Sequence, residues 1–114
     1  MRRIALIAVL SLSAVLSGCT TKSTTGGPCT GNADCTTPLL CATNFTGGYC
    51  SRDCTTDTSV CAAGSACVGI GQNATSAECY ATCATPNVQS TCRTGYTCAP
   101  VTGLAGVAGI CLPN

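Results

Sequence analysis

The sequence predicts a small disulfide-rich protein, with a signal helix, a flexible tether and three tandem four-cysteine modules that contain short β-hairpins and little regular structure. Three observations predict this class. Thirteen of the 114 residues are cysteines, and they recur at repeated spacings. Large apolar side chains are few, with one Phe, three Tyr and no Trp. Because ordering the chain costs about 1.5 kcal/mol per residue, a protein with so small an apolar core requires covalent staples.

Residues 1–18 have the pattern of a signal peptide. Arg2 and Arg3 precede an apolar stretch, residues 4–16, that is interrupted only by two serines. This stretch is shorter than the roughly 20 residues that a permanent membrane-spanning helix needs. A short positive segment followed by a short apolar one is typical of an export signal that is removed from the mature protein.

The stretch Leu16-Ser17-Gly18-Cys19 resembles the lipobox of bacterial lipoproteins. In that family the cysteine receives a diacylglyceryl group and becomes the first mature residue, so the resemblance implies lipidation at Cys19 and a membrane anchor. Thr20 is not the aspartate that the family links to inner-membrane retention, so the resemblance implies the outer membrane, either at its periplasmic face or at the cell surface. Ordinary signal cleavage also suits Ser17-Gly18, and a secreted protein is the alternative.

Residues 19–28 are expected to form a flexible tether. After the cysteine they read TTKSTTGGP, which is small, polar and without periodicity. Such a composition is typical of linkers that hold a domain away from a membrane surface.

The twelve cysteines that follow Cys19 divide into three groups of four. The gaps between them hold five, five and eight residues in the first group, six, five and eleven in the second, and eight, five and twelve in the third. The repeat predicts modules at residues 29–53, 54–82 and 83–114, with six disulfides that stay within the groups. The predicted disulfide cysteines are Cys29, Cys35, Cys41, Cys50, Cys54, Cys61, Cys67, Cys79, Cys83, Cys92, Cys98 and Cys111.

The constant element is the five-residue gap between the second and third cysteines. Its middle residue is Pro38, Gly64 or Gly95, which predicts a turn at one fixed place in each group. The third gap is rich in Gly, Asn and Thr, which favours a hairpin with the third and fourth cysteines on its two strands. An interlaced first–third, second–fourth pairing would tie the turn to the hairpin and is favoured; two local loops are the alternative.

This pattern resembles short cysteine-rich repeats of secreted and lipid-anchored bacterial proteins that have no known activity. The opening Cys29-x5-Cys35-x5-Cys41 is also similar to the cysteine-rich N-terminal module of Dickkopf-like proteins. Both resemblances cover cysteine spacing and the turn residue, and neither implies a function. The short links 51–53 and 80–82, together with the sparse apolar surface, predict near-independent modules.

Catalysis, cofactor binding and nucleic-acid binding all lack their usual residues. The chain contains no histidine, so the usual base for a nucleophilic serine or cysteine is missing. A metal-thiolate protein would favour Cys-x2-Cys spacings, which do not occur. Beyond the leader, three cations face four carboxylates, which leaves no basic patch for phosphates. These charged residues are Lys22, Arg52, Arg93, Asp34, Asp53, Asp57 and Glu78.

Two functions remain. The first is a non-enzymatic, lipid-anchored envelope protein with a structural, adhesive or protein-binding role, held to the membrane through Cys19 and meeting a protein partner at the cell surface. The second is a secreted knottin-like effector or inhibitor. Tyr49 and Tyr80 each adjoin a fourth cysteine, so we expect them to pack against disulfides rather than to form a binding face.

Overall fold

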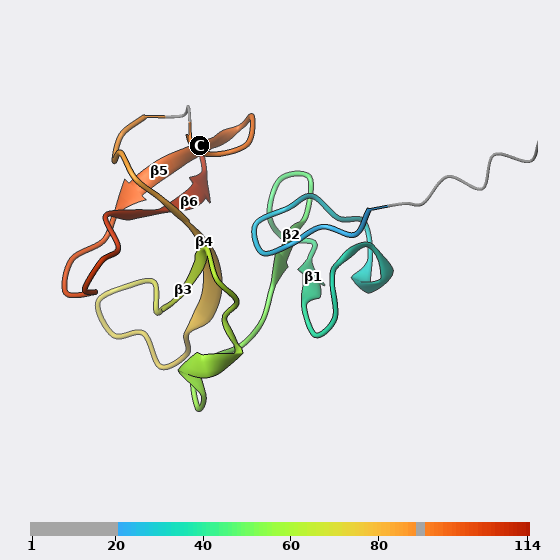
Figure 1. The fold of residues 1–114 in the computed structure, drawn as a ribbon, viewed down its shortest axis with the longest axis horizontal. Helices are drawn as coiled ribbons and strands as arrows, with labels where there is room; N and C mark the ends of the chain where they lie inside the picture. The colour runs from blue at the N-terminus through green and yellow to red at the C-terminus, as the bar shows by residue number, and fades with distance from the viewer. Residues whose placement is uncertain (1–20, 89–90) are drawn as a thin grey trace, which may run out of the picture.

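The computed structural model describes residues 21–88 and 91–114, and the predicted signal segment and Cys19 lie outside these ranges. Regular structure in the described residues is short and mostly extended (Figure 1). Two 3-10 turns and six strands occur: η1 (Asn32–Asp34), β1 (Leu40–Ala42), β2 (Tyr49–Ser51), η2 (Thr58–Val60), β3 (Ser65–Val68), β4 (Glu78–Cys83), β5 (Tyr96–Pro100) and β6 (Gly109–Pro113). None of the helical turns in the described ranges has the length or apolar character to cross a bilayer.

The strands form the three expected hairpins. β1 pairs with β2, β3 with β4, and β5 with β6, all antiparallel. In each hairpin the third cysteine of the group lies directly opposite the fourth. The opposed pairs are Cys41 and Cys50, Cys67 and Cys79, and Cys98 and Cys111. The register therefore places these cysteines at neighbouring positions, each free to bridge to a cysteine outside the hairpin.

The six disulfides adopt the interlaced pairing that the spacing favoured. Within each group the first cysteine bonds the third and the second bonds the fourth, so no bridge leaves its group. The pairs are Cys29–Cys41, Cys35–Cys50, Cys54–Cys67, Cys61–Cys79, Cys83–Cys98 and Cys92–Cys111. Each hairpin is thus fastened on both strands to the segment that precedes it.

The predicted turn is present in all three groups. Gly64 and Gly95 have φ of +81° and +85°, a left-handed conformation that favours glycine. Pro38 occupies the same place in the first group. Each turn closes with a backbone hydrogen bond just before the third cysteine, for example from the Tyr96 N–H to the Arg93 carbonyl oxygen at 3.0 Å.

The expectation of near-independent modules is wrong, because the groups share a sheet. β4 pairs with β3 and with β6, which gives a four-stranded sheet in the order β3-β4-β6-β5. The pairing of β4 with β6 joins Thr82 to Ile110 and Cys83 to Gly109. The stretch 80–82, expected to be a link, lies within β4 itself. The second and third groups therefore form one body.

A shared aromatic core joins the first group to this body. Tyr49, Tyr80, Tyr96 and Ile110 pack together, and each is no more than 6% exposed. The rings of Tyr49 and Tyr80 have centroids 5.8 Å apart, and those of Tyr49 and Tyr96 lie 5.7 Å apart. The tyrosines are buried as expected, but their main partners are one another, with only Cys92 of the disulfides at the edge. The sequence predicted too small a core because these rings come from three different groups.

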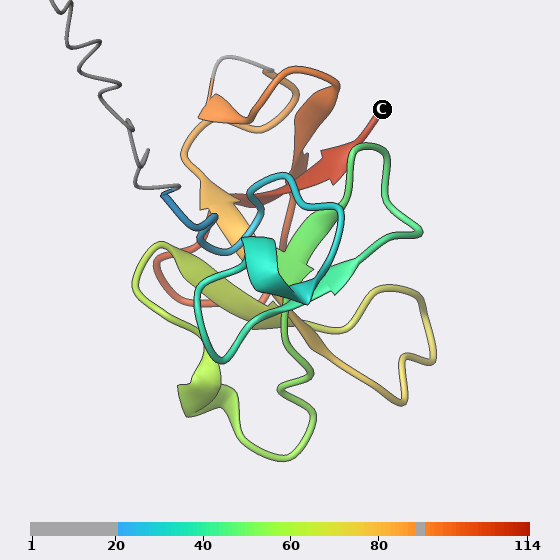
Figure 2. The ribbon, with the colours of Figure 1, turned by 90° about the vertical axis from the view of Figure 1, so that its right-hand side faces the viewer.

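The tether prediction is wrong for residues 23–28. Ser23 forms a parallel bridge with Cys35, and the Gly26 N–H donates to the Cys50 carbonyl oxygen at 2.9 Å. The Cys50 N–H in turn donates to the Gly27 carbonyl oxygen at 3.0 Å. Small polar side chains indicate a linker by composition, but the backbone of this stretch is bonded to the domain, at Asp34 and Thr36 through Ser23 and at Cys50 of β2 through Gly26 and Gly27. Figure 2 shows this segment and η1 in front of the hairpins of the other groups.

Candidate functional site

A groove opens where the hairpins of the second and third groups diverge. β4 and β6 pair over only two residues each, so the rest of each hairpin is free to separate. Gly109 stands at the crossing, where an added Cβ would lie 2.6 Å from the Ala99 carbonyl oxygen and 2.7 Å from Cys98 Sγ. Only glycine therefore allows this close approach. Beyond the crossing the loops 69–77 and 101–108 lie apart at the left of Figure 1.

The groove is uncharged, and its larger side chains are apolar. It has a volume of about 500 Å³, and none of its lining residues carries a charge. Ile70 and Leu104 are large hydrophobic residues at its rim, with 52% and 39% of their surface exposed. We call this site the apolar groove and define it by Val68, Ile70, Val101, Leu104, Ile110 and Leu112. Exposed apolar side chains around a concave site are typical of a binding surface.

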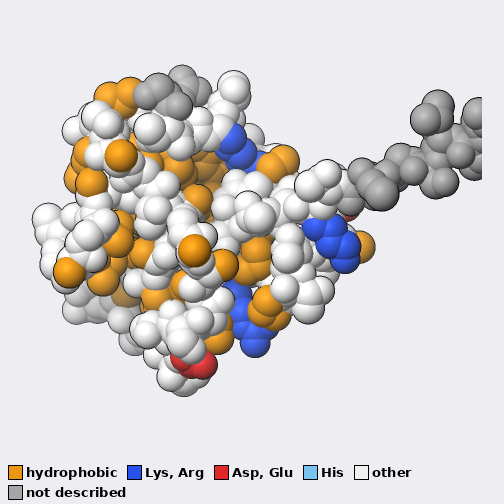
Figure 3. Space-filling model, in the orientation of Figure 1, with side chains coloured by type: hydrophobic (Ala, Val, Ile, Leu, Met, Phe, Trp, Pro, Cys, Tyr) orange, Lys and Arg blue, Asp and Glu red, His pale blue; other side chains and the backbone are white. Residues whose placement is uncertain are grey.

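The charges lie elsewhere on the molecule. On the face shown in Figure 3, basic and acidic side chains appear over the centre, the right and the lower edge, while the left part shows hydrophobic and uncharged side chains. A charged ligand would lose its hydration in the apolar groove without gaining an ion pair from its walls. The groove therefore suits an uncharged, apolar ligand segment.

The floor of the groove is part of the aromatic core, which makes it rigid. Ile110 lines the groove and also belongs to the tyrosine cluster, against which Val68 and Leu112 pack. Tyr49 lies beneath and is fully buried; its hydroxyl donates to the Cys111 carbonyl oxygen at 3.2 Å and accepts from the Ala81 N–H at 2.9 Å. Burial raises the pKa of Tyr49 to about 12, so the phenol stays neutral.

Arg93 fastens the same core from the side. Its guanidinium lies 4.1 Å from the centre of the Tyr96 ring and 6.0 Å from that of Tyr49. Nη2 donates to the Thr46 carbonyl oxygen at 3.1 Å and makes a short hydrogen bond to the Gly48 carbonyl oxygen. This cation therefore has a structural role, and it is not among the residues that line the groove.

A second hollow lies between the first and second groups. Its volume is about 290 Å³, and it is lined by four threonines and by small or largely buried apolar residues, namely Thr24, Thr25, Thr36, Thr37, Pro38, Leu39, Val60, Ala62 and Ala63. Thr25 Oγ1 is buried and has no hydrogen-bond partner in the described part of the chain. The hollow is smaller than the apolar groove, and no large exposed hydrophobic residue stands at its rim, so we consider the groove the better candidate.

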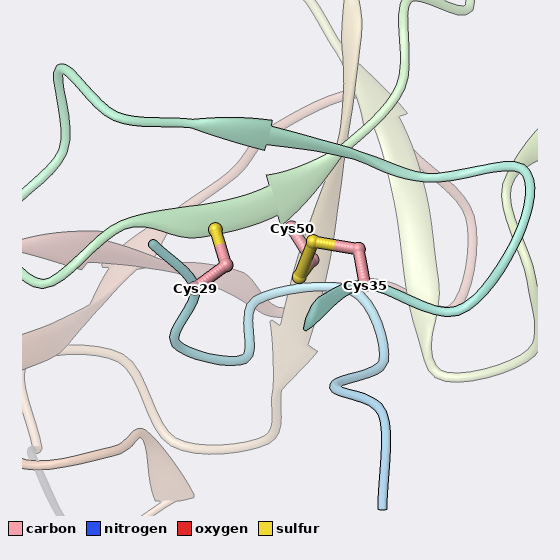
Figure 4. Close-up of side chains that lie close together, drawn as sticks. All are labelled: Cys29, Cys35 and Cys50. Atoms are coloured by element: carbon pink, nitrogen blue, oxygen red, sulfur yellow. A yellow bond between two sulfur atoms is a disulfide. The ribbon is translucent and has the colours of Figure 1, made fainter. Parts of the chain in front are cut away.

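Sulfur atoms also gather in each group, but as disulfides. Cys29, Cys35 and Cys50 bring their Sγ atoms within 4.8 Å of one another, and Figure 4 shows the bond between Cys35 and Cys50. Cys29 is bonded to Cys41. Metal coordination by cysteine requires thiolates, and these sulfur atoms are all oxidised. Each cluster therefore consists of sulfur atoms from two neighbouring disulfides.

The aspartates serve local turns. Asp53 accepts from the Thr55 N–H and Asp57 from the Ser59 N–H, each at 2.9 Å. Asp34 accepts from the Thr30 and Gly31 N–H groups. Hydrogen bonds from these neighbours lower the pKa of all three carboxyls, which makes them weak bases. The hydroxyls of Ser59 and Thr30 also donate to Asp57 and Asp34, at 2.6 and 2.8 Å, and complete these local turns.

Sequence reasoning missed the apolar groove, although one signal was present. Ile70 and Leu104 are the largest apolar residues of two hairpin loops that otherwise consist of small and polar residues and two valines. The predicted site residue Cys19 lies outside the described ranges, whereas the twelve predicted disulfide cysteines are all found in bridges.

Comparison with known proteins adds no relative. No family model matches the chain, and neither a curated protein nor a solved structure resembles it significantly.

Proposed function

We propose that this chain is a non-enzymatic, lipid-anchored protein of the bacterial outer membrane that binds a protein partner through its apolar groove. The signal segment 1–18 is removed, Cys19 is acylated, and the three four-cysteine groups are repeats of one unit fused into a single domain. The observation that carries the anchor is the cysteine inventory. All twelve later cysteines bond one another, so the chain holds no partner for Cys19.

The resemblance of Leu16-Ser17-Gly18-Cys19 to a lipobox supports lipidation as the role of this remaining cysteine. A diacylglyceryl group and an N-linked acyl chain together exceed the two signals that stable anchoring takes. The six bridges favour an oxidising compartment, which agrees with export. A protein-binding role is preferred over a purely structural one because the groove exposes Ile70 and Leu104 over a rigid floor.

The anchor is tested by the intact mass of protein purified from membranes. We expect a mass increase of one diacylglyceryl and one acyl group on a chain that begins at Cys19, and partitioning into detergent. Cys19→Ala should accumulate as precursor or in soluble fractions. A soluble mature chain without acyl mass would contradict the anchor and favour the secreted knottin-like effector or inhibitor.

The groove is tested by selection of displayed peptides on the oxidised domain. We expect enrichment of uncharged apolar peptides whose binding is lost in Leu104→Asp. Val88→Asp is the matched control, because Val88 is also 39% exposed but lies outside the groove. Peptides that bind both variants equally, or a failure to enrich any, would contradict the proposed binding site.

A further inference from the structure

Ser23, which lies four residues after the proposed anchor Cys19, already belongs to the folded domain. The Ser23 N–H donates to the Asp34 carbonyl oxygen at 2.7 Å, and its own carbonyl oxygen accepts from the Thr36 N–H at 2.8 Å. The Ser23 hydroxyl donates to the Pro28 carbonyl oxygen at 2.8 Å. The neighbouring Cys35 is held by a disulfide to fully buried Cys50. Ser23 is therefore a fixed point of the domain.

The covalent distance from Cys19 to Ser23 is short. Four Cα steps span at most about 14 Å, whereas the expected ten-residue tether would have spanned up to about 36 Å. A folded domain of about 100 residues has a radius of gyration of about 13 Å. A lipid attached at Cys19 therefore cannot lie farther from Ser23 than roughly one domain radius, and it cannot pass around to the opposite side.

We propose that the face around Ser23 rests on the phospholipid headgroups of the bilayer, so that the apolar groove points away from the membrane. This inference depends on the proposed lipid anchor. The domain then lies on the membrane surface instead of being held away from it, and the short segment between Cys19 and Ser23 determines which face it turns to the bilayer.

The chemistry of this face suits a headgroup layer. We call it the anchor face and define it by Thr21, Lys22, Ser23, Pro28, Ala33 and Asp34. It carries no large hydrophobic side chain, so it has no reason to enter the hydrocarbon. Asp34 is engaged by the Thr30 hydroxyl and backbone N–H, both at 2.8 Å, while Lys22 is exposed and forms no ion pair within the described ranges. A lysine near an anionic surface contributes about 1 kcal/mol of attraction, and the ionised Asp34 carboxylate opposes it, so the face is close to neutral overall and is neither repelled by the headgroups nor driven into the hydrocarbon.

The groove lies at the other end of the molecule. In Figure 1 the chain from residue 21 enters at the right, and the loops 69–77 and 101–108 that bound the groove extend to the left. With the anchor face on the bilayer, Ile70 and Leu104 face the aqueous side. The groove would then receive a partner from solution rather than an acyl chain from the same leaflet.

Two exposed alanines allow a direct test. Ala33 lies on the anchor face and Ala105 lies in a groove loop. An azide-bearing amino acid at either position, coupled to a fluorophore, avoids any new cysteine. The lipidated protein is placed in vesicles of phosphatidylethanolamine and phosphatidylglycerol that contain a spin-labelled headgroup lipid. We expect several-fold stronger quenching at position 33 than at position 105.

An insertion of a Gly-Ser linker between Lys22 and Ser23 should reduce that difference, because it restores the reach of a long tether. Equal quenching at both positions in protein whose Cys19 is shown by mass to be acylated would overturn the orientation alone. Absence of the acyl mass would overturn the anchor and the orientation together. Stronger quenching at position 105 would place the groove on the membrane and also overturn the proposal.

Discussion

The third group is joined to its two neighbours in different ways. It meets the second group through backbone pairing of β4 with β6. It meets the first group through side chains: the Tyr49 hydroxyl reaches Cys111, the Tyr96 hydroxyl donates to the Thr46 carbonyl oxygen at 2.9 Å, and Arg93 bonds the same loop. The three groups share one disulfide pairing, but two different kinds of contact hold them together. A side-chain junction can be weakened by a single substitution, whereas a backbone junction cannot.

The largest effect should follow from Tyr49→Ala. This change deletes a ring that is fully buried among residues of all three groups. Truncating a buried aromatic residue typically costs about 3–5 kcal/mol. We expect amide hydrogen exchange to rise sharply in residues 21–50 and only modestly in β5 and β6, as measured by mass spectrometry on the oxidised protein.

Tyr49→Phe is the control for this prediction. It keeps the ring and removes only the two hydroxyl hydrogen bonds, so the loss should be about 1–2 kcal/mol. Uniform exchange throughout the chain in Tyr49→Ala would show that the two junctions are not separable, and would contradict the comparison.

Two disulfides offer a matched second test. Cys35–Cys50 and Cys83–Cys98 both join residues 15 positions apart, so the loop-closure entropy that each removes is equal. Replacing either pair by alanine should cost about 3 kcal/mol. The damage should differ in its extent. Loss of the first bridge should labilise residues 21–50, while loss of the second should spread through β4 into the second group.

Limited proteolysis with mass detection would locate the damage. The control is the intact pairing of the remaining five bridges, read from unreduced peptide maps. If deletion of Cys83–Cys98 left the second group as resistant as in the parent protein, the shared sheet would not couple the two groups.

Arg93 provides a smaller and more local test of the side-chain junction. Arg93→Ala removes two hydrogen bonds to carbonyl oxygens and the stacking on Tyr96, so we expect a loss of about 2 kcal/mol. Arg93→Lys keeps the charge but loses the planar fork, and should recover only part of that loss. Chemical denaturation of the oxidised protein measures both. Full recovery by lysine would mean that charge alone, rather than the fork and stacking, holds the loop.

The disulfide frame could be predicted from sequence because its determinants are local. The gap around Pro38, Gly64 and Gly95 is short enough that turn chemistry fixes the path between the second and third cysteines. The junctions depend instead on residues such as Tyr49 and Tyr96, which are far apart in sequence and carry no repeated pattern. The sequence predicts that Tyr49 packs against the neighbouring disulfide, because the residues around it give no information about rings in other groups.

Two other features escaped prediction for different physical reasons. Ser23 bonds the backbone of Asp34 and Thr36, and Gly26 and Gly27 bond that of Cys50 in β2, so the small side chains of this stretch gave no sign of these contacts. The apolar groove depends on the angle at which two hairpins cross near Gly109, and that angle follows from packing rather than from the composition of either hairpin.

The smallest expected effect is a loss of stability at high pH that originates in the side-chain junction. Burial, the largest cause, raises the pKa of Tyr49 to about 12 from an ordinary value near 10, and Tyr80 and Tyr96 beside it act in the same direction while Arg93 opposes them. The neutral phenol is thus favoured in the folded protein. Its contribution is fully present below pH 10 and is lost as the pH rises through 12, because the unfolded chain ionises first. At pH 11 the loss is about 1.4 kcal/mol.

Denaturant unfolding of the oxidised protein at pH 8 and at pH 11, with short exposure to alkali, measures this loss. Tyr49→Phe has no phenol at position 49 to ionise. It should therefore show only the smaller loss of stability that comes from Tyr80, since burial raises the pKa of Tyr80 as well. Hydrogen exchange should place the alkaline loss in residues 21–50, where the phenol holds the first group to the shared sheet. If the free energy of unfolding of Tyr49→Phe fell by the same amount between pH 8 and pH 11, the alkaline sensitivity would come from other groups. High pH would then not act through the side-chain junction.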